Sequence, residues 1–378
     1  MAVLALIALG GIISTRQRPA AGAAAASFGE KNPSAAWLTF TYEEGDVIGG
    51  FAAKVGHALN AMGIATLTRP NWQGADFFWH SGYRPTRWTP NVFYWQNVYF
   101  NLENFHVDAS KGETLLQTRH ADPDQVGNHR VHHVPWAWVA FEHRKQTPNA
   151  TYLLRPRHYD AAKKTRFCAF AASYCNYERD YLKLYGGHLN GIKQPRTEFF
   201  ETLNKSYPRR RIDALGPCYH NRDEPPVPEE YKARYPGWTI HDSFIYLMRD
   251  YKFVMSFENM ATPGYFTEKL FNAYLGGALP IYWGDPRVDE LVNTEAFIWC
   301  REHPEDPRGR WARCIDRIIE LDNDPVAYAK VFEQPILKNN RIPEWMSYEV
   351  LARKLLTGWN MVVPGSHGKH FRRPPHAL

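Results

Sequence analysis

Residues 251–286 of this chain, YKFVMSFENMATPGYFTEKLFNAYLGGALPIYWGDP, carry the pattern that decides the fold. An apolar run ends at Phe257, a polar loop follows, and a helical pattern begins near Thr267 and closes at Gly276-Gly277. A second apolar run comes next. Apolar runs that alternate with helices of about ten residues are typical of βαβ units, so this stretch predicts parallel strands joined by a helix.

The loop and the helix start that follows it also predict a ligand site. In open α/β sheets, ligands bind beyond the carboxyl ends of strands, where helix N-termini offer free N–H groups. We expect Thr267 to be the N-cap, Lys269 to add a positive charge, and Glu268 to accept hydrogen bonds from a ribose or sugar hydroxyl. This combination suits a sugar-nucleotide diphosphate. An ordinary helix start has a similar pattern, because Glu near an N-terminus suits the helix dipole.

The same alternation extends along the chain in two blocks. The first block predicts strands at 37–41, 75–80 and 91–95, a helix at 50–62 with Phe51, Val55 and Leu59 on its apolar face, and a polar loop over 103–128. The second block predicts strands at 166–173, 252–257, 278–283 and 296–300, and helices at 196–203, 239–249, 267–275, 308–321 and 325–332. Two such blocks indicate a two-domain α/β protein with a cleft between the domains.

Composition limits the classes of function. Apolar residues make up 44% and charged residues 22%, which is typical of a folded globular protein. A net charge of +6 is compatible with anionic ligands such as nucleotide diphosphates. Nucleic acid is not expected as a partner, because only residues 209–211 form a tight basic run. The five cysteines have no zinc-site spacing and are compatible with one or two disulfides.

The N-terminal segment indicates a secretory route. An uncharged apolar run at 3–13 precedes Arg16, Arg18 and an Ala-rich stretch, which suits a signal peptide or a signal-anchor that tethers the chain to a membrane. Two glycosylation sequons, at Asn149 and Asn204, agree with that route. We expect a protein on the lumenal side of the Golgi membrane, with a secreted or soluble protein as the alternative.

The stretch 257–286 resembles the donor-binding signature of the α-1,3/1,4-fucosyltransferase family, YKF-x3-FEN…Y-x-TEK…G-x-x-PIYWG-x-P, over some thirty-five positions when 251–256 are included. Segments 166–173, 196–203, 212–216 and 325–337 resemble flanking motifs of the same family. The resemblance implies two facing Rossmann-like domains of the GT-B type, with the active site in the cleft between them. It also implies GDP-fucose as the donor, held by the C-terminal domain, and an acceptor held by the N-terminal one.

The resemblance assigns site residues in the donor domain. Arg196 and Lys269 occupy the positions where the family neutralises the diphosphate, whereas Asn259, Tyr265 and Glu268 occupy those that hold phosphate, ribose and fucose. Glu268 is therefore also a candidate for a direct part in catalysis. The family needs no metal or other cofactor, and the one DxD-like string, 122–124, lies in the loop-rich first half.

The general base is less well defined by the sequence. The bacterial pattern that carries the catalytic Glu best matches 92–97, but Gln96 stands at the Glu position, and an amide cannot accept the proton. Animal members carry the Glu after a W-x-W pattern, which resembles 136–142 and favours Glu142. Glu103, just past the strand pattern, is the next candidate. A salt-bridge role is the alternative for either carboxylate.

These observations predict an inverting α-1,3-fucosyltransferase that acts on a GlcNAc-containing glycan or glycoprotein. A transferase of the same fold for another sugar nucleotide, and a non-catalytic protein that only binds a GDP-sugar, are the alternatives. The second is suggested by Gln96. The expected divisions are 1–26 for the leader and linker, 27–160 for the acceptor domain, 161–345 for the donor domain and 346–378 for a C-terminal tail.

Overall fold

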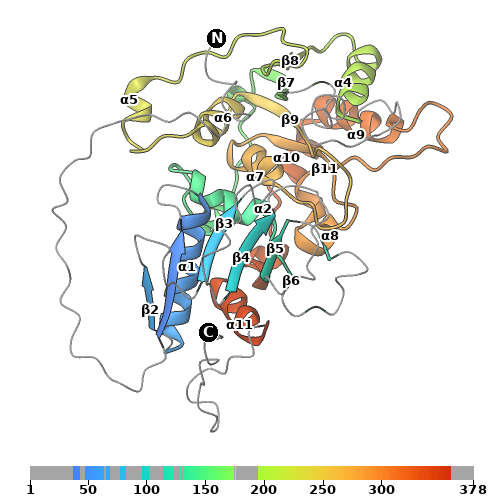
Figure 1. Ribbon diagram of the computed structural model, residues 1–378. Helices are drawn as coiled ribbons and strands as arrows, with labels where there is room; N and C mark the ends of the chain where they lie inside the picture. The colour runs from blue at the N-terminus through green and yellow to red at the C-terminus, as the bar shows by residue number, and fades with distance from the viewer. Residues whose placement is uncertain are drawn as a thin grey trace.

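Two parallel β-sheets, one in each half of the chain, organise the computed structural model (Figure 1). The structure describes residues 37–42, 47–63, 65–68, 77–81, 96–101, 114–118, 120–121, 128, 131–173, 175 and 195–358. Both sheets are parallel in every pairing, and the predicted α/β class with two Rossmann-like halves is confirmed.

The N-terminal sheet has the strand order β2-β1-β3-β4-β5-β6. Its strands are β1 (Trp37–Tyr42), β2 (Ala65–Thr68), β3 (Phe77–Ser81), β4 (Gln96–Asn101), β5 (Thr114–Gln117) and β6 (Val131–His133). Helix α1 (Val47–Ala61) joins β1 to β2, and Phe51, Val55 and Leu59 on its predicted apolar face are fully buried.

The C-terminal sheet has the strand order β11-β10-β9-β7-β8. Its strands are β7 (Arg166–Phe170), β8 (Ile212–Ala214), β9 (Tyr251–Phe257), β10 (Leu279–Trp283) and β11 (Ile298–Trp299). Every residue of β9 and β10 is buried, as expected for central strands of a parallel sheet covered on both faces. The helices of this half are α4 (Pro195–Ser206), α5 (Glu229–Lys232), α6 (Ile240–Met248), α7 (Glu268–Leu275), α8 (Val288–Leu291), α9 (Ala312–Asn323) and α10 (Pro325–Phe332).

Short helices connect the two sheets. They are α2 (Trp136–Val139) and the 3-10 turns η2 (Ala140–His143), η3 (Ala150–Leu154) and η4 (Ala161–Lys163). Further 3-10 turns, η5 (Thr294–Ala296), η6 (Lys338–Asn340) and η7 (Glu344–Met346), lie later in the chain. Residues 346–378 were expected to be a tail, but helix α11 (Tyr348–Gly358) returns to the N-terminal half and lies beside α1 (Figure 1). The predicted divisions near residues 26 and 160 stay predictions.

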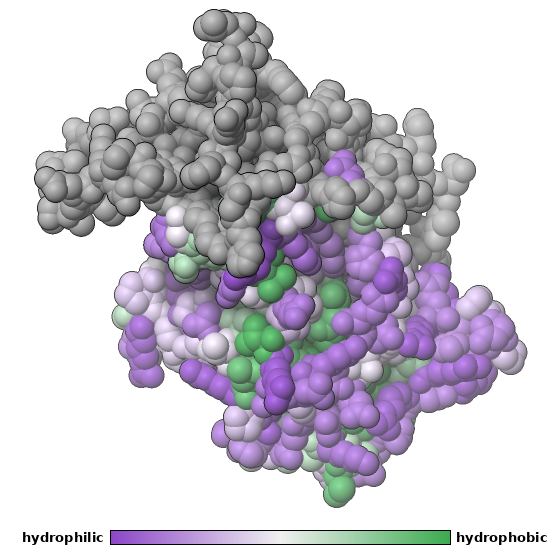
Figure 2. Space-filling view, turned by 90° about the horizontal axis from the view of Figure 1, so that it is seen from below, coloured by the Kyte–Doolittle hydropathy of each residue, from purple (hydrophilic) through white to green (hydrophobic). Residues whose placement is uncertain are grey.

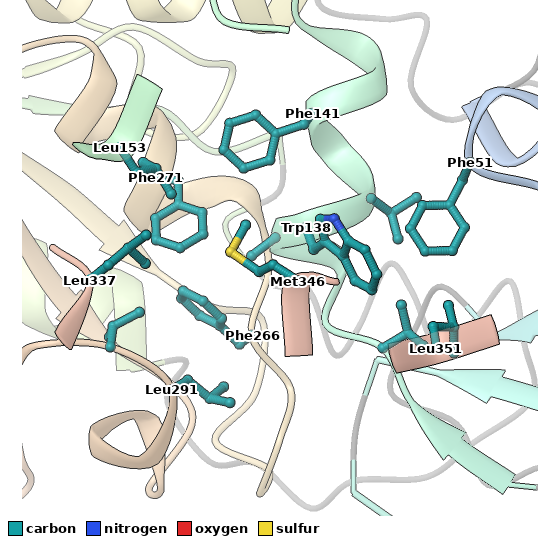
Figure 3. Packing of buried hydrophobic residues seen from close by; sticks show 14 of the residues in the cluster. Phe51, Trp138, Phe141, Leu153, Phe266, Phe271, Leu291, Leu337, Met346 and Leu351 are labelled. Atoms are coloured by element: carbon teal, nitrogen blue, oxygen red, sulfur yellow. The ribbon is translucent and has the colours of Figure 1, made fainter. Parts of the chain in front are cut away.

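One hydrophobic cluster is shared by both halves. Phe51 of α1 and Trp138 of α2 belong to the same cluster as Phe266 and Phe271 of the 251–286 stretch. Figure 3 shows Trp138 and Met346 lying between Phe51 on one side and Phe271 on the other. On the face shown in Figure 2, the described surface is largely hydrophilic, with hydrophobic residues gathered near its middle. The loop and helix of the quoted motif therefore pack directly against the N-terminal half.

Four short strands, β2, β5, β6 and β8, were not predicted as strands from the sequence. β5 lies inside 103–128, so the expectation of a continuous loop there was wrong. A four-residue strand such as TLLQ offers too few positions for an alternating pattern to stand out. The strand expected at 91–95 lies outside the described residues, and β4 begins at Gln96.

The cysteines form two disulfides, Cys175–Cys218 and Cys300–Cys314, and Cys168 is free and buried in β7. The sequence had left one or two disulfides possible, and the structure contains two. None of the helices in the described ranges has the length and apolar character needed to cross a bilayer.

A buried ionic cluster ties β9 to α9. The Asp322 side chain is only 1% exposed, and it accepts hydrogen bonds from Lys252 Nζ at 3.0 Å, Arg210 Nε at 2.7 Å and Tyr207 Oη at 2.9 Å. Burial alone would raise the pKa of Asp322, but these bonds lower it below its ordinary value.

We predict that Asp322→Asn lowers the free energy of unfolding at pH 7 by about 3 kcal/mol, because Lys252 loses its buried counter-charge. The stabilisation from ionised Asp322 is complete above the pKa of about 3.9 that an Asp has in the unfolded chain. It is lost as falling pH protonates Asp322 in the folded protein, so the difference in free energy of unfolding between wild type and Asp322→Asn becomes smaller in acid. Urea unfolding across pH measures it. Asp316→Asn on the same helix is the control, since Asp316 pairs with Arg308 at the surface and its loss costs under about 1 kcal/mol. Equal losses for the two variants would contradict this account.

Candidate functional site

The loop between β9 and α7 begins at the carboxyl end of the central strand pair. Phe257 of β9 is in register with Trp283 of β10, and the Glu258 N–H continues the ladder by donating to Trp283 O at 2.8 Å. Gly284 makes room for the chain here, because a Cβ on Gly284 would lie 2.3 Å from Glu258 Cγ. The polar loop therefore starts at the sheet edge where ligands of such folds bind.

Glu258 is the residue around which this loop folds. Its side chain is fully buried, and its two oxygens accept from Thr267 N at 2.8 Å and from Thr267 Oγ1 at 2.6 Å. Lys269 Nζ lies 3.4 Å from Glu258 Oε2. Burial raises the pKa of Glu258, while the charge of Lys269 and the bonds from Thr267 oppose that rise. The carboxylate thus holds both ends of the loop together.

Thr267 and Lys269 lie where the sequence predicted them. Thr267 is the N-cap residue of α7, but its hydroxyl donates to Glu258 instead of capping the helix. Lys269 Nζ donates to Thr267 Oγ1 at 3.0 Å and lies 3.4 Å from Glu268 Oε1. The Lys269 side chain is 29% exposed, so part of it is accessible to solvent.

Arg196 reaches the same loop from α4. Its Nη2 donates to Asn259 Oδ1, one residue beyond Glu258, and the Arg196 residue is 6% exposed. A second network fixes the first turn of α4, because Arg310 bridges Glu198 and Glu302 while Glu302 accepts from Trp283 Nε1 at 2.9 Å. The structure therefore brings the two predicted cations to neighbouring residues, Arg196 to Asn259 and Lys269 to Glu258.

Tyr265 and Glu268 complete the predicted donor residues. Tyr265 is 2% exposed, so protein atoms enclose its ring in this structure. Glu268 is the first residue of α7, and its side chain is 17% exposed. Burial would raise the pKa of Glu268, but Lys269, His241, its own backbone N–H and Arg144 together lower it to about 2. Glu268 is consequently a carboxylate at neutral pH.

The N-terminal half holds the loop by three hydrogen bonds that the sequence did not predict. His120 N donates to Pro263 O at 2.9 Å, His133 Nε2 lies 2.9 Å from Gly264 O, and Ala137 N donates to Phe266 O at 3.1 Å. Gly264 has a φ of 81°, and a Cβ there would lie 2.4 Å from the His120 ring. Burial lowers the pKa of His133 to about 4, so the ring is neutral at pH 7.

The candidate bases are placed differently from one another. Glu142 Oε1 lies 2.6 Å from Lys54 Nζ and accepts from Tyr348 Oη at 2.9 Å, which ties η2 to α1 and α11. This geometry favours the salt-bridge role for Glu142. Gln96 is the first residue of β4, at the amino end of a parallel strand. β4 ends at Asn101, and Glu103 lies outside the described residues.

The described residues form no metal site, and the cavity that they line lies apart from the 251–286 stretch. Among the described residues, no group of three or more His, Cys, Asp or Glu side chains is placed to hold a metal ion, and the DxD-like string at 122–124 is not described. A cavity of about 430 Å³ opens between β11, α9 and α10, and none of its lining residues belongs to the 251–286 stretch.

Known proteins resemble this chain in both sequence and fold. The family described as Glycosyltransferase family 10 (fucosyltransferase) C-term matches residues 162–336. GDP-fucose protein O-fucosyltransferase 3 of Xenopus laevis is 35% identical over 125 residues, which cover 32% of this chain and 24% of that protein. Alpha-(1,3)-fucosyltransferase B of Drosophila melanogaster is 33% identical over 108 residues, or 28% of this chain and 23% of that protein. The matched regions thus span about a quarter of each relative's length.

Two crystal structures share the fold over nearly the whole chain. Alpha1,3-fucosyltransferase with GDP has a TM-score of 0.56 and 17% identity, covering 90% of this chain and 95% of that one. The same kind of enzyme with GDP-fucose has a TM-score of 0.53 and 18% identity, covering 92% and 96%. This likeness establishes the predicted GT-B arrangement of two facing Rossmann-like domains. Residues 162–336 of this chain are therefore a fucosyltransferase C-terminal domain of glycosyltransferase family 10.

Proposed function

We propose that this chain transfers L-fucose from GDP-fucose to a GlcNAc-containing glycan, forming an α-1,3 linkage by a single inverting displacement. The observation that carries the proposal is the pair of cations, Arg196 and Lys269, which contact Asn259 and Glu258 at the carboxyl edge of the sheet. The family match over 162–336 and the fold shared with fucosyltransferases that bind GDP and GDP-fucose support the choice of donor.

The proposed chemistry follows from the charges at this loop. Cleavage of the fucose–phosphate bond leaves negative charge on GDP, which Arg196 and Lys269 stabilise. The guanidinium of Arg196 can donate two parallel hydrogen bonds to a phosphate group. The sugar becomes oxocarbenium-like, and the ionised Glu268 carboxylate at the start of α7 favours that positive charge. A base takes the proton of the attacking acceptor hydroxyl. No metal or other cofactor takes part in this proposal.

A second acceptor class is favoured by one specific observation. The vertebrate relative with 35% identity is named a protein O-fucosyltransferase, so a hydroxyl on a protein is the alternative acceptor. We propose the glycan first, because the insect relative and the two solved structures are named α-1,3 enzymes. Placement on the lumenal side of the Golgi membrane, through the apolar run at 3–13, is a further proposal from the sequence.

An acceptor array with labelled GDP-fucose tests this choice. We expect label on N-acetyllactosamine-type or N-glycan acceptors, with linkage analysis placing fucose on O3 of GlcNAc. Label on folded protein domains without glycans would support O-fucosylation and contradict the glycan proposal. Faster transfer from another sugar nucleotide would contradict GDP-fucose as donor. GDP-fucose binding without transfer to any acceptor would indicate a non-catalytic binder.

The cations give a direct mutational prediction. Lys269→Met and Arg196→Met should each lower turnover at least about a hundredfold, because charge that develops on the diphosphate loses a counter-charge. Steady-state rates with GDP-fucose measure this loss. Thermal unfolding must be recorded in parallel, since Lys269 also compensates the buried Glu258. Lys330→Met is the matched control, because this exposed lysine lines the distant cavity of the same half. Normal rates in folded Lys269→Met would rule out the donor-site assignment.

The base candidates are separated by comparing Glu103→Gln with Glu142→Gln. We expect Glu103→Gln to lose at least about a hundredfold in turnover while it still binds GDP, as for removal of a general base. Glu142→Gln should mainly lower the melting temperature, because it breaks the contacts to Lys54 and Tyr348. A Glu142→Gln protein with normal stability and no turnover would reverse the assignment.

A further inference from the structure

The segment 143–146, at the end of η2, is tied to the start of helix α6. Thr239 Oγ1, at the N-cap of α6, donates to His143 O at 2.7 Å. Asp242 Oδ1 accepts from Lys145 N and Gln146 N, both at 2.8 Å. The backbone on each side of Arg144 is therefore fixed to the C-terminal half, although Arg144 itself follows the N-terminal sheet in the chain.

Arg144 enters the C-terminal half as a buried cation. The residue is 1% exposed, and its Nε donates to Asn272 Oδ1 of α7 at 2.9 Å. Its guanidinium carbon lies 4.4 Å from the centre of the Phe141 ring. Within the described residues, neither Nη1 nor Nη2 has a hydrogen-bond partner. A buried guanidinium with two unbonded amino groups is costly unless nearby charge balances it.

The balancing charge lies on α7 and α6. Burial lowers the pKa of Arg144 to about 10, while the carboxylates of Glu268 and Asp242 oppose that change, so the guanidinium remains charged at pH 7. Glu268 and Asn272 are four residues apart on α7 and therefore share one helix face. Asn272 Nδ2 also lies 3.3 Å from His241 Nδ1, which links the same face to α6.

We propose that Arg144 is a positioning residue for the donor site: anchored on Asn272, it fixes the Glu268 end of α7 from the N-terminal side of the fold. This inference rests on the proposed function, which places Glu268 beside the transferred sugar. It goes further, because it states that Glu268 is correctly placed only when the two halves of the chain are packed together. The same carboxylate gains a nearby positive charge that is shielded from solvent.

Glu268 is surrounded by charges from several elements. Its own helix supplies Lys269, the preceding loop supplies Glu258, α6 supplies His241, and the residue after η2 supplies Arg144. Asp242 and His143 interact with His241 beside them. Burial lowers the pKa of His241 to about 4, so this ring carries no charge at pH 7. Lys269 and Arg144 are cations that act on Glu268 at neutral pH. Removal of Arg144 leaves Lys269 alone against Glu258 and Glu268.

The direct test is a carboxyl titration that needs no substrate. Full-length protein labelled with ¹³Cδ-glutamate is titrated by NMR, and the Glu268 signal is identified by its loss in Glu268→Gln. We expect Glu268 of the wild type to stay ionised to the lowest pH at which the protein is folded. In Arg144→Met its pKa should rise by about one pH unit or more, because an opposite charge is removed nearby. Arg144→Lys keeps the positive charge, so the pKa of Glu268 in this variant should stay close to its low wild-type value.

Arg157→Met is the matched control. Arg157 is another guanidinium with buried, unbonded nitrogen atoms, and it packs 4.1 Å from the ring centre of Tyr274 on the same helix. Its removal should leave the Glu268 titration unchanged. The acid limb of kcat/KM with GDP-fucose should move to higher pH in Arg144→Met and stay in place in Arg157→Met. Where Arg144→Met does not fold, Arg144→Gln makes the same comparison.

The outcomes separate this inference from the proposed function. A Glu268 titration that is the same in wild type and Arg144→Met would overturn the inference, even if the enzyme transfers fucose. An equal shift in Arg157→Met would also overturn it. A shift specific to Arg144→Met in a protein that transfers fucose to no acceptor would uphold the positioning role and overturn the proposed function.

Discussion

The buried carboxylate of Glu258 is the constraint on which the site depends. It lies at the end of the central strand and accepts both hydrogen bonds from Thr267, so the ten-residue stretch from 258 to 267 returns to its starting point. A buried carboxylate is costly unless it is paired, and Lys269 supplies the pairing charge. That lysine is thereby held at the sheet edge with part of its side chain in solvent. The structural need of one acid thus fixes the position of the cation that we propose binds the diphosphate.

The site is also shaped by the junction of the two halves. Phe266 and Phe271 share a hydrophobic cluster with residues of α1, α2 and α11, and backbone bonds from residues 120 and 137 hold the loop from the other side (Figure 3). The C-terminal helix extends this junction, because α11 packs on α1 far from its place in the sequence. The loop is therefore held by contacts from both halves of the chain.

The quoted stretch predicted much of this arrangement, because strand, loop, N-cap and Gly-Gly stop all lie within local sequence patterns. Arg196 lies outside this stretch, and its place at the loop was assigned by the family resemblance. Strands β9 and β10 and the start of α7 after Thr267 were predictable from the stretch itself. The roles of Glu258 and Arg144 were not, since each depends on partners that only the fold brings near. Glu142 had a plausible motif context, yet its neighbours Lys54 and Tyr348 lie far away in sequence. Short strands such as β5 carry too little periodicity to be seen.

The central claim is that a cationic loop at the sheet edge binds the diphosphate of a guanine nucleotide. Calorimetric titration of the folded wild-type chain with GDP, at low and at moderate salt, tests it most directly. The account predicts one bound GDP per chain and weaker binding at the higher salt, because exposed charges are screened. No heat of binding for GDP at either salt concentration, in a protein that unfolds cooperatively, would contradict it.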